Sequence, residues 1–271
     1  MRAPLITLSS DIGQPDYLVG AIKAMLWKVN PEFQLVDITH QIPPFNYTQA
    51  AYVCGTATRQ FPDFSYHLLL VNLFEQKPTQ LLLAYHKEQY FLCADNGLLT
   101  MMLEEKPEIV MAIPLQTEKT PNTLEIAEAM GRTVQQLVEG KSILSVGIPD
   151  VNYLEKRPLR PIIHADYLEG QIIFIDSFEN IVVNIRKEHF EEQRKGRPFQ
   201  ILFRRDETID RISESYADVA SGDKLALFNS AGYLEIAINK GNAAGLFGLK
   251  GYAENMRQSQ LAYQTVRIVF G

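Results

Sequence analysis

Residues 5–13 read LITLSSDIG, an apolar run that ends in polar residues and a glycine. The run from Leu5 to Leu8 is short and uncharged, which is typical of a buried β-strand. After it, apolar residues recur at helical spacing between Leu18 and Val29, and this pattern predicts an amphipathic helix. Since a strand followed by a helix is the repeating unit of α/β folds with parallel strands, the chain is expected to begin with such a fold.

The same alternation continues through the first half of the chain. Further strand-like runs lie at residues 33–38, 67–73, 81–85, 90–93 and 109–113, and helical patterns lie at 47–61 and from 122 to about 140. Glu125 follows Asn122 by three residues, which predicts a capping box at the start of the last helix. We therefore expect residues 1–150 to form an N-terminal α/β domain with a central, mostly parallel sheet.

The second half has a different texture. Residues 151–159 are rich in charged residues and include a proline. This composition does not suit the interior of a helix or strand, so it predicts a linker. Strand-type residues then dominate 171–185, 225–238 and 265–270, with one short polar helix near 188–194. Residues 160–271 are therefore expected to form a smaller, β-rich domain of the barrel or sandwich type.

Composition excludes several classes of function. The 271 residues carry a formal net charge of -6, with acidic and basic residues interleaved, so neither a nucleic-acid partner nor a polybasic membrane contact is expected. No apolar stretch is long enough to span a bilayer, and no signal segment is expected before Leu5, which favours a cytoplasmic protein. Cys54 and Cys93 lack the spacing of metal or redox motifs, so no metal site is expected.

Polar residues follow the first two predicted strands, where α/β sheets bind ligands. A carboxylate at Asp11 can accept two hydrogen bonds from a ribose diol, or it can cap the next helix or its turn. His40 fits either a base or a hydrogen-bonded structural residue. Phe45 can stack on a sugar or pack as an ordinary aromatic. The residues alone leave these alternatives open, and the common phosphate, dinucleotide and hydrolase motifs are absent from the sequence.

Several stretches resemble, in the same order, the S-adenosylmethionine hydroxide adenosyltransferase family, which includes fluorinating and chlorinating enzymes. In the first half these are Asp11 with Gly13, Lys23, the segment 36–44 (VDITHQIPP) and the segment 95–99 (DNGLL). In the second half they are 176–185 (DSFENIVVNI) and 229–237 (NSAGYLEIA). Ordered matches in both halves are more specific than any one of them.

The resemblance implies an assembly as well as a fold. The protein is expected to be a homotrimer that binds an adenosyl ligand between the N-terminal domain of one subunit and the C-terminal domain of the next. S-adenosylmethionine would be the substrate or ligand, without a further cofactor. Asp11 would hold the ribose hydroxyls and Phe45 would flank the sugar. The C-terminal side would contribute Asp176, Phe178, Asn180 and Ser230.

Local sequence offers a second interpretation of two of these segments. Residues 176–180 are rich in turn-forming residues and could be a hairpin turn, while 95–97 is a strong turn signal.

The chain departs from the family at the residues that activate water. The family's hydrolytic members use an Asp and an Arg in the loop after the third strand, with a His further on. Here Asn72 takes the Asp position, no Arg follows nearby, and no His lies between His86 and His164. Since an amide does not accept a proton from water, Glu75 and Lys77 could supply activation and anchoring, or they could be a solvated pair of opposite charges.

Three functions remain open from the sequence. The first is an enzyme that hydrolyses S-adenosylmethionine to adenosine and methionine, with Asn72 and Glu75 as candidate catalytic residues. The second is a catalytically inactive trimer that binds adenosine or S-adenosylmethionine as a sensor or scaffold. The third is a structural protein without a nucleoside ligand.

Overall fold

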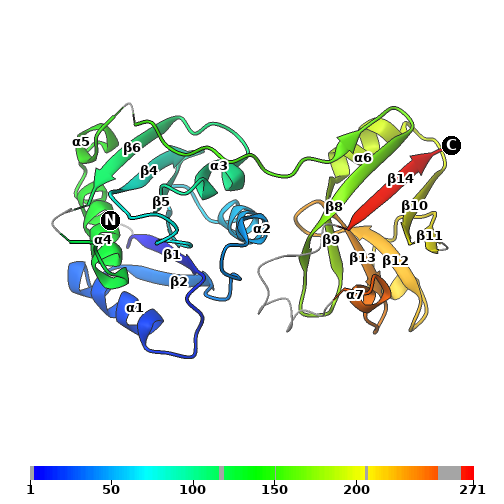
Figure 1. The fold of residues 1–271 in the computed structure, drawn as a ribbon, viewed down its shortest axis with the longest axis horizontal. Coiled ribbons are helices and arrows are strands. Elements are labelled where there is room, and N and C mark those ends of the chain that lie inside the picture. The colour runs from blue at the N-terminus through cyan, green and yellow to red at the C-terminus, as the bar shows by residue number, and fades with distance from the viewer. Residues whose placement is uncertain (1–2, 116–118, 150, 205–206, 250–263) are drawn as a thin grey trace. The chain divides into compact units, whose positions relative to one another are not determined.

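The computed structural model describes residues 3–115, 119–149, 151–204, 207–249 and 264–271. The chain divides into two compact units, Met1–Pro158 and Leu159–Gly271. Figure 1 shows the elements of both units, and each unit has a hydrophobic core of its own.

The first unit alternates strands and helices, as the sequence predicts. Its strands are β1 (Leu5–Ser10), β2 (Gln34–Thr39), β3 (Tyr66–Leu70), β4 (Gln80–His86), β5 (Gln89–Ala94) and β6 (Ile109–Pro114). Its helices are α1 (Leu18–Val29), α2 (Tyr47–Thr58), α3 (Leu98–Leu103), α4 (Thr123–Val138) and α5 (Ile143–Val146). The sequence did not predict α3 and α5, because neither is long enough to show a helical period.

The strands of this unit form one six-stranded sheet in the order β2-β1-β3-β5-β4-β6. The neighbours β2, β1, β3 and β5 are parallel, whereas β4 is antiparallel to both β5 and β6. The turn from β4 to β5 consists of Lys87 and Glu88, both at positive φ, which is the backbone of a tight hairpin turn. The prediction of a mostly parallel sheet is therefore confirmed, with one strand reversed by a hairpin.

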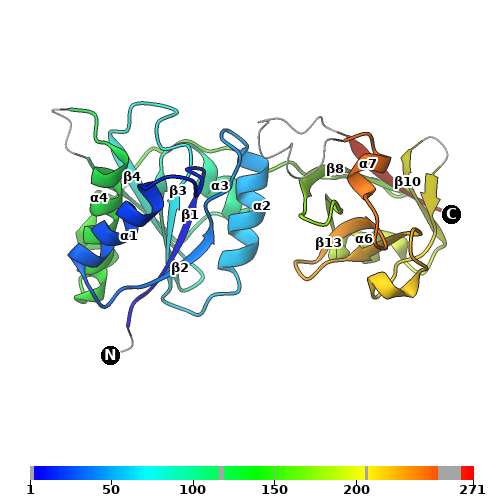
Figure 2. The same ribbon diagram turned by 90° about the horizontal axis from the view of Figure 1, so that it is seen from below.

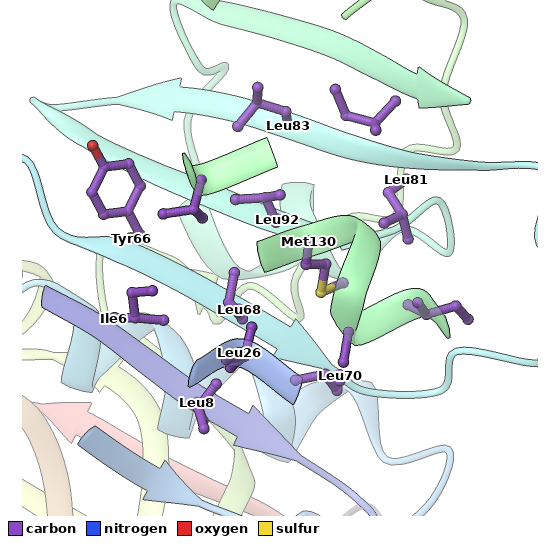
Figure 3. Packing of buried hydrophobic residues seen from close by; sticks show 14 of the residues in the cluster. Ile6, Leu8, Leu26, Tyr66, Leu68, Leu70, Leu81, Leu83, Leu92 and Met130 are labelled. Atoms are coloured by element: carbon purple, nitrogen blue, oxygen red, sulfur yellow. The ribbon is translucent and has the colours of Figure 1, made fainter. Parts of the chain in front are cut away.

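Helices cover both faces of this sheet. Helices α1 and α4 pack on one face, and α2 and α3 pack on the other (Figure 2). Leu26 of α1 and Met130 of α4 point toward strand residues such as Leu8, Leu68 and Leu92, and all five side chains are fully buried (Figure 3). Burying a side chain of this size contributes about 1.5–3 kcal/mol, so these contacts fix the helices to the sheet.

The capping box that the sequence predicts opens α4. Asn122 Oδ1 accepts the backbone N–H groups of Leu124 and Glu125 at 2.9 and 3.0 Å, and Glu125 Oε2 accepts the N–H of Asn122 at 2.8 Å. Although α4 has 16 residues, no helix in the described ranges is long and apolar enough to cross a membrane.

The second unit is built around an antiparallel sheet. Its strands are β7 (Ile162–Ile163), β8 (Tyr167–Ile175), β9 (Ile181–Arg186), β10 (Phe199–Arg204), β11 (Glu207–Ile209), β12 (Lys224–Phe228), β13 (Tyr233–Ile238) and β14 (Thr265–Phe270). They follow the order β11-β10-β14-β8-β9-β13-β12, with β7 beside β8. The helices are α6 (Lys187–Arg194), α7 (Ala243–Leu246) and the 3-10 turn η1 (Tyr216–Asp218). The curved sheet closes nearly into a barrel around Phe190, as expected for a β-rich domain.

The segment that joins the two units has no regular secondary structure from residue 151 to residue 161. Its first part is nevertheless held on the first unit. The N–H of Leu154 donates to Asp95 Oδ1 at 2.8 Å, and the N–H of Lys156 donates to Thr100 Oγ1 at 2.9 Å. Residues up to Pro158 therefore belong to the first unit rather than to a free linker.

Candidate functional site

The parallel strands of the first unit end at one edge of the sheet, and each is followed by polar residues. Asp11 follows β1, His40 follows β2, Asn72 follows β3, and Asp95 with Asn96 follows β5. Since these strands are neighbours, the loops after them meet, as at the ligand sites of other α/β sheets. The structure therefore brings together three residues singled out in the sequence, Asp11, Phe45 and Asn72.

Asp11 holds the neighbouring loop rather than a helix. Its Oδ2 accepts the backbone N–H of Asn72 at 2.9 Å. The helix that follows begins at Leu18, whose N–H donates to Asp16 Oδ1 at 2.9 Å, so the interpretation of Asp11 as the cap of that helix is wrong. Burial raises the pKa of the Asp11 carboxyl above its ordinary value, and the N–H of Asn72 opposes this rise. The result is a partly exposed carboxylate with one firm protein partner.

Asn72 connects the loops around it. It is at positive φ, is 6% exposed, and accepts the N–H of Phe45 on Oδ1 at 2.9 Å. Asn96 Nδ2 donates to the carbonyl of Asn72 at 3.3 Å. Among the described residues, no acceptor forms a hydrogen bond with Asn72 Nδ2. The Asn72 side chain is nevertheless close to the Tyr47 hydroxyl and lowers its pKa, against the effect of burial. The Asn72 amide nitrogen is thus buried among these loops rather than open to solvent.

Phe45 is not a core aromatic. It is 63% exposed and takes a left-handed backbone conformation with φ at 62°. A residue with a Cβ adopts this conformation at a cost of about 1–2 kcal/mol, and the hydrogen bond to Asn72 holds it there. The ring is therefore presented to solvent beside Asp11, where an aromatic face can stack on a ligand.

A second cluster adjoins these residues. The Tyr47 hydroxyl donates to Glu75 Oε2, and Lys156 Nζ lies 3.5 Å from the same oxygen and 3.5 Å from the centre of the Tyr47 ring. Burial, followed by the hydrogen bond and charge of Glu75, raises the pKa of Tyr47. The cation beside Glu75 is Lys156, which the sequence reasoning missed, whereas Lys77 of the same loop is exposed.

His40 is a structural residue. It is 2% exposed, its Nδ1 is 2.8 Å from Ser10 Oγ, and its Nε2 is 3.1 Å from Asp37 Oδ1. Lys23 Nζ contacts the other oxygen of Asp37 at 2.5 Å. The order Ser-His-Asp matches a hydrolytic triad, but Ser10 has no exposed surface and cannot reach a substrate as a nucleophile. This chain of contacts instead ties β1 to the end of β2.

In the second unit, Asp176 organises the loop between β8 and β9. Its Oδ1 accepts the N–H groups of Phe178 and Asn180 at 2.9 and 2.8 Å, and its Oδ2 accepts Asn180 Nδ2 at 3.1 Å. The interpretation of 176–180 as a turn is therefore confirmed. Asn180 is buried at 5% exposure, while the Phe178 ring is 76% exposed, so the turn presents an aromatic side chain to solvent.

Ser230 is exposed in the hairpin between β12 and β13. The buried Glu235 on β13 connects this hairpin to the Asp176 loop. Glu235 Oε1 accepts the Tyr216 hydroxyl at 2.6 Å. Burial raises the pKa of Glu235. Hydrogen bonds from Tyr216, Asn229 and Asn180 lower it in part, and Asn229 is the neighbour of Ser230. Local sequence does not mark Glu235, because an acidic residue that alternates with apolar residues is ordinary in a strand.

Taken by themselves, the side chains at the sheet edge of the first unit suit a polar ring with neighbouring hydroxyl groups. A carboxylate accepts such hydroxyls, and an exposed ring stacks. No cluster of three or more His, Cys, Asp or Glu residues that could hold a metal occurs in the described part of the chain. The chemistry that these residues offer is therefore recognition by hydrogen bonds and stacking.

Comparison with solved structures supports the fold as a whole. A structure of an uncharacterized conserved protein from Thermotoga maritima superimposes with a TM-score of 0.81 at 25% identity, over 97% of this chain and 99% of that chain. A conserved hypothetical protein from Thermus thermophilus shares the fold with a TM-score of 0.70 at 22% identity, over the full length of both chains.

Similar sequences extend over both units as well. The chain is 28% identical over 256 residues to the (R)-S-adenosyl-L-methionine hydrolase of Methanocaldococcus jannaschii, covering 90% of this chain and 92% of that protein. It is 25% identical over 290 residues to the fluorinase of Nocardia brasiliensis, covering 92% and 95%. Models of the N-terminal and C-terminal domains of SAM hydroxide adenosyltransferases match residues 6–147 and 170–254. The chain therefore belongs to the SAM hydroxide adenosyltransferase family.

Proposed function

We propose that this protein hydrolyses S-adenosylmethionine to adenosine and methionine, by attack of water on the ribose carbon that is bonded to sulfur. The observation that carries the proposal is the placement of Asp11, Phe45 and Asn72 at one sheet edge, in a chain whose relatives include (R)-S-adenosyl-L-methionine hydrolases over about nine-tenths of its length. S-adenosylmethionine enters as the substrate, and no further cofactor takes part.

Asp11 binds the ribose in this proposal. Two vicinal hydroxyls donate to one carboxylate, which fixes the orientation of the sugar. A hydrogen bond to a charged group contributes about 1.5–3 kcal/mol when its geometry is good. Phe45 flanks the sugar with its exposed ring, and Asn72 holds the Phe45 backbone in place through its Oδ1. The hydrogen bonds that already join these residues support the proposal, because they hold the site in place before the ligand arrives.

The second unit supplies the other side of the site, in a homotrimer whose ligands lie between subunits. Phe178 and Ser230 are exposed on turns that Glu235 connects, and they face the adenine or the methionine end of the ligand. Asp176 and Asn180 act mainly by holding the first of these turns, since their side chains are bonded to each other.

A second candidate function is an adenosyl-binding trimer without turnover, which senses or stores its ligand. One observation favours it: Asn72 stands where the family's hydrolytic pattern has a carboxylate, and its Oδ1 is engaged by the N–H of Phe45. An amide in that place binds but does not accept a proton from water.

Two measurements on purified protein test both candidates. The first follows adenosine and methionine by liquid chromatography after incubation with S-adenosylmethionine, and the second records calorimetric heats with adenosine and S-adenosylmethionine. Hydrolysis requires both products in equal amounts, together with binding that Asp11→Ala abolishes. The matched control is Asp63→Ala, an exposed Asp in the loop before β3, which leaves both signals unchanged.

The outcomes separate the candidates. Binding heat without formation of adenosine and methionine contradicts the hydrolase and supports the binding trimer. Absence of heat with either ligand contradicts both candidates.

A further inference from the structure

Three side chains from distant parts of the sequence meet beside Asn72: Tyr47 at the start of α2, Glu75 in the loop after β3, and Lys156 from the segment that joins the two units. We propose that Glu75 accepts the proton of the attacking water, and that Tyr47 and Lys156 are positioning residues that hold its carboxylate. This inference rests on the proposed hydrolysis and names the groups that take over from the family's missing water-activating residues.

Glu75 is held on two sides but is not enclosed. The Tyr47 hydroxyl and the Lys156 ammonium both contact its Oε2, while the side chain remains 36% exposed. A solvated surface pair would lose side-chain entropy on forming one geometry and would contribute little to stability. Here a third, aromatic partner fixes the arrangement, because Lys156 Nζ lies over the Tyr47 ring at 3.5 Å from its centre. The carboxylate is therefore both oriented and accessible to water.

The position of Lys156 is built into the backbone around it. Its N–H donates to Thr100 Oγ1 at 2.9 Å, and Thr100 Oγ1 donates to its carbonyl at 2.8 Å. Its side chain then passes over Gly97, where a Cβ would lie 2.5 Å from Lys156 Cγ. Gly97 has φ at 86°, a conformation that also favours glycine. Lys156 is therefore held both at its backbone and along its side chain, which fixes the position of its ammonium group.

The cluster adjoins the group that is proposed to bind ribose. The charge of Asp11 is close enough to raise the pKa of Tyr47, and the Asn72 side chain also acts on that hydroxyl. Tyr47 lies two residues after Phe45, whose N–H donates to Asn72. Since the reacting carbon belongs to the ribose that Asp11 would hold, a group that activates water must lie within about one sugar's length of Asp11. Glu75 contacts Tyr47, the residue on which the charge of Asp11 acts.

The reaction balances with these residues alone. The water oxygen forms a bond to the 5′ carbon while the carbon–sulfur bond breaks, and sulfur keeps the bonding pair and becomes the neutral thioether of methionine. The water proton passes to Glu75 and then to solvent. The leaving sulfur needs no acid, because it departs without charge. Tyr47 keeps its own proton throughout, since its pKa is raised, and it acts as a donor that orients Glu75.

Kinetics of four variants test this assignment. Glu75→Gln should lower kcat about 100-fold, as expected for loss of a general base, with KM changed less than about threefold because ribose binding is untouched. Tyr47→Phe and Lys156→Met should lower kcat by about tenfold, and Lys156→Arg should recover part of the loss because it restores the charge. The matched control is Lys77→Met, an exposed lysine of the Glu75 loop, which should keep the wild-type kcat.

The split between kcat and KM gives a readout that a purely structural role would not produce. The charged and titratable groups around Glu75 are Tyr47 and Lys156, with Asp11 beyond Tyr47. Because none of these variants removes a group that is proposed to bind the substrate, the loss should appear in kcat, with KM changed less than about threefold. Thermal melts of each variant confirm that the fold is retained.

Each outcome decides one question. Adenosine formation that persists at the wild-type rate in Glu75→Gln, or a loss in Lys156→Met that Lys156→Arg does not recover at all, overturns these assignments and leaves the proposed hydrolysis standing. A wild-type protein that forms no adenosine overturns the proposed hydrolysis, and this inference with it.

Discussion

At the scale of single residues, the candidate site carries a cost to the fold. Burial raises the pKa of Asp11, which means that the folded protein disfavours the charged form of this carboxylate. The nearby Asn72 amide lacks an acceptor within the described ranges, and Phe45 takes a backbone conformation that non-glycine residues rarely adopt. Unfavourable features of this kind gather where a ligand compensates for them.

The change Asp11→Asn should separate stability from binding. For a carboxyl whose pKa is raised by folding, the contribution to stability is greatest below the ordinary pKa of 3.8 and falls as pH rises through the folded-state pKa. Asparagine can still accept the N–H of Asn72 and is never charged. The variant should therefore melt at a higher temperature than the wild type at pH 7, with the difference vanishing near pH 3.5, as measured by circular dichroism.

The same variant should bind adenosine about 10- to 100-fold more weakly, because the bond to the ribose loses its charge. Calorimetry at pH 7 measures this loss. A lower melting temperature together with unchanged affinity would show that Asp11 serves the fold instead of a ligand.

Some of these residues could be predicted from the sequence and others could not. Asp11 and Phe45 could be singled out because they follow predicted strands, and strand order alone brings the ends of parallel strands together. Lys156 could not, since it contacts Glu75 across 81 residues of sequence and nothing local marks the contact. Glu235 could not be singled out either, since its partner Tyr216 lies 19 residues away in the sequence.

At the scale of secondary-structure elements, the sequence predicted the helices and strands that are long enough for their hydrophobic period to repeat. The helix α1 and the capping box of α4 lie where periodicity and capping residues placed them. The six-residue α3 lies between Gly97 and Glu104, both in left-handed conformations, and it directly follows the strong turn signal at 95–97. So short a helix is stabilised by the burial of its leucines and methionines rather than by local propensity. Its position matters, because Thr100 on α3 holds Lys156.

The contact between η1 and β13 should make the stability of the second unit depend on pH. In Tyr216→Phe the buried Glu235 loses a hydrogen bond of 2.6 Å, and leaving a buried acceptor without this partner costs about 1–3 kcal/mol. That bond lowers the pKa of Glu235 against the effect of burial, so its removal raises the pKa further. The destabilisation should be small below the ordinary pKa of 4.5 and should grow as pH rises above it.

Urea unfolding followed by circular dichroism at pH 4 and pH 7 measures this difference. Tyr17→Phe is the matched control, because the Tyr17 side chain is 74% exposed. This variant should unfold like the wild type at both pH values. A Tyr216→Phe penalty that is equal at pH 4 and pH 7 would show that the hydroxyl acts by packing and not through the carboxylate.

At the scale of the whole molecule, the residues proposed to bind one ligand are divided between two units. Asp11 and Phe45 belong to Met1–Pro158, whereas Phe178 and Ser230 belong to Leu159–Gly271. The family models cover both parts. Sequence patterns predict each unit, since strand and helix periods are local, but they do not say which subunits share a site. In the proposed trimer, that depends on surfaces that meet only between subunits.

Mixed trimers should reveal whether subunits share their sites. Asp11→Ala damages the N-terminal side and Phe178→Ala the C-terminal side, so each variant alone should hydrolyse S-adenosylmethionine poorly. If every site joins the N-terminal unit of one subunit to the C-terminal unit of the next, each trimer that contains both variants keeps one intact site, so about one third of the sites in these mixed trimers are intact. Co-expression of the two variants with different tags, followed by tandem purification and an adenosine assay, should recover activity of that order.

The matched control is the pair Asp11→Ala and Phe45→Ala. Both changes damage the N-terminal side, so no combination of these subunits restores a site and the mixture should stay as inactive as its parts. Because subunit mixing itself is the same in the two experiments, a difference between them can come only from complementation across a subunit boundary. Equal inactivity of both mixtures, in trimers shown by mass to contain both variants, would place each complete site within one subunit and contradict the shared arrangement.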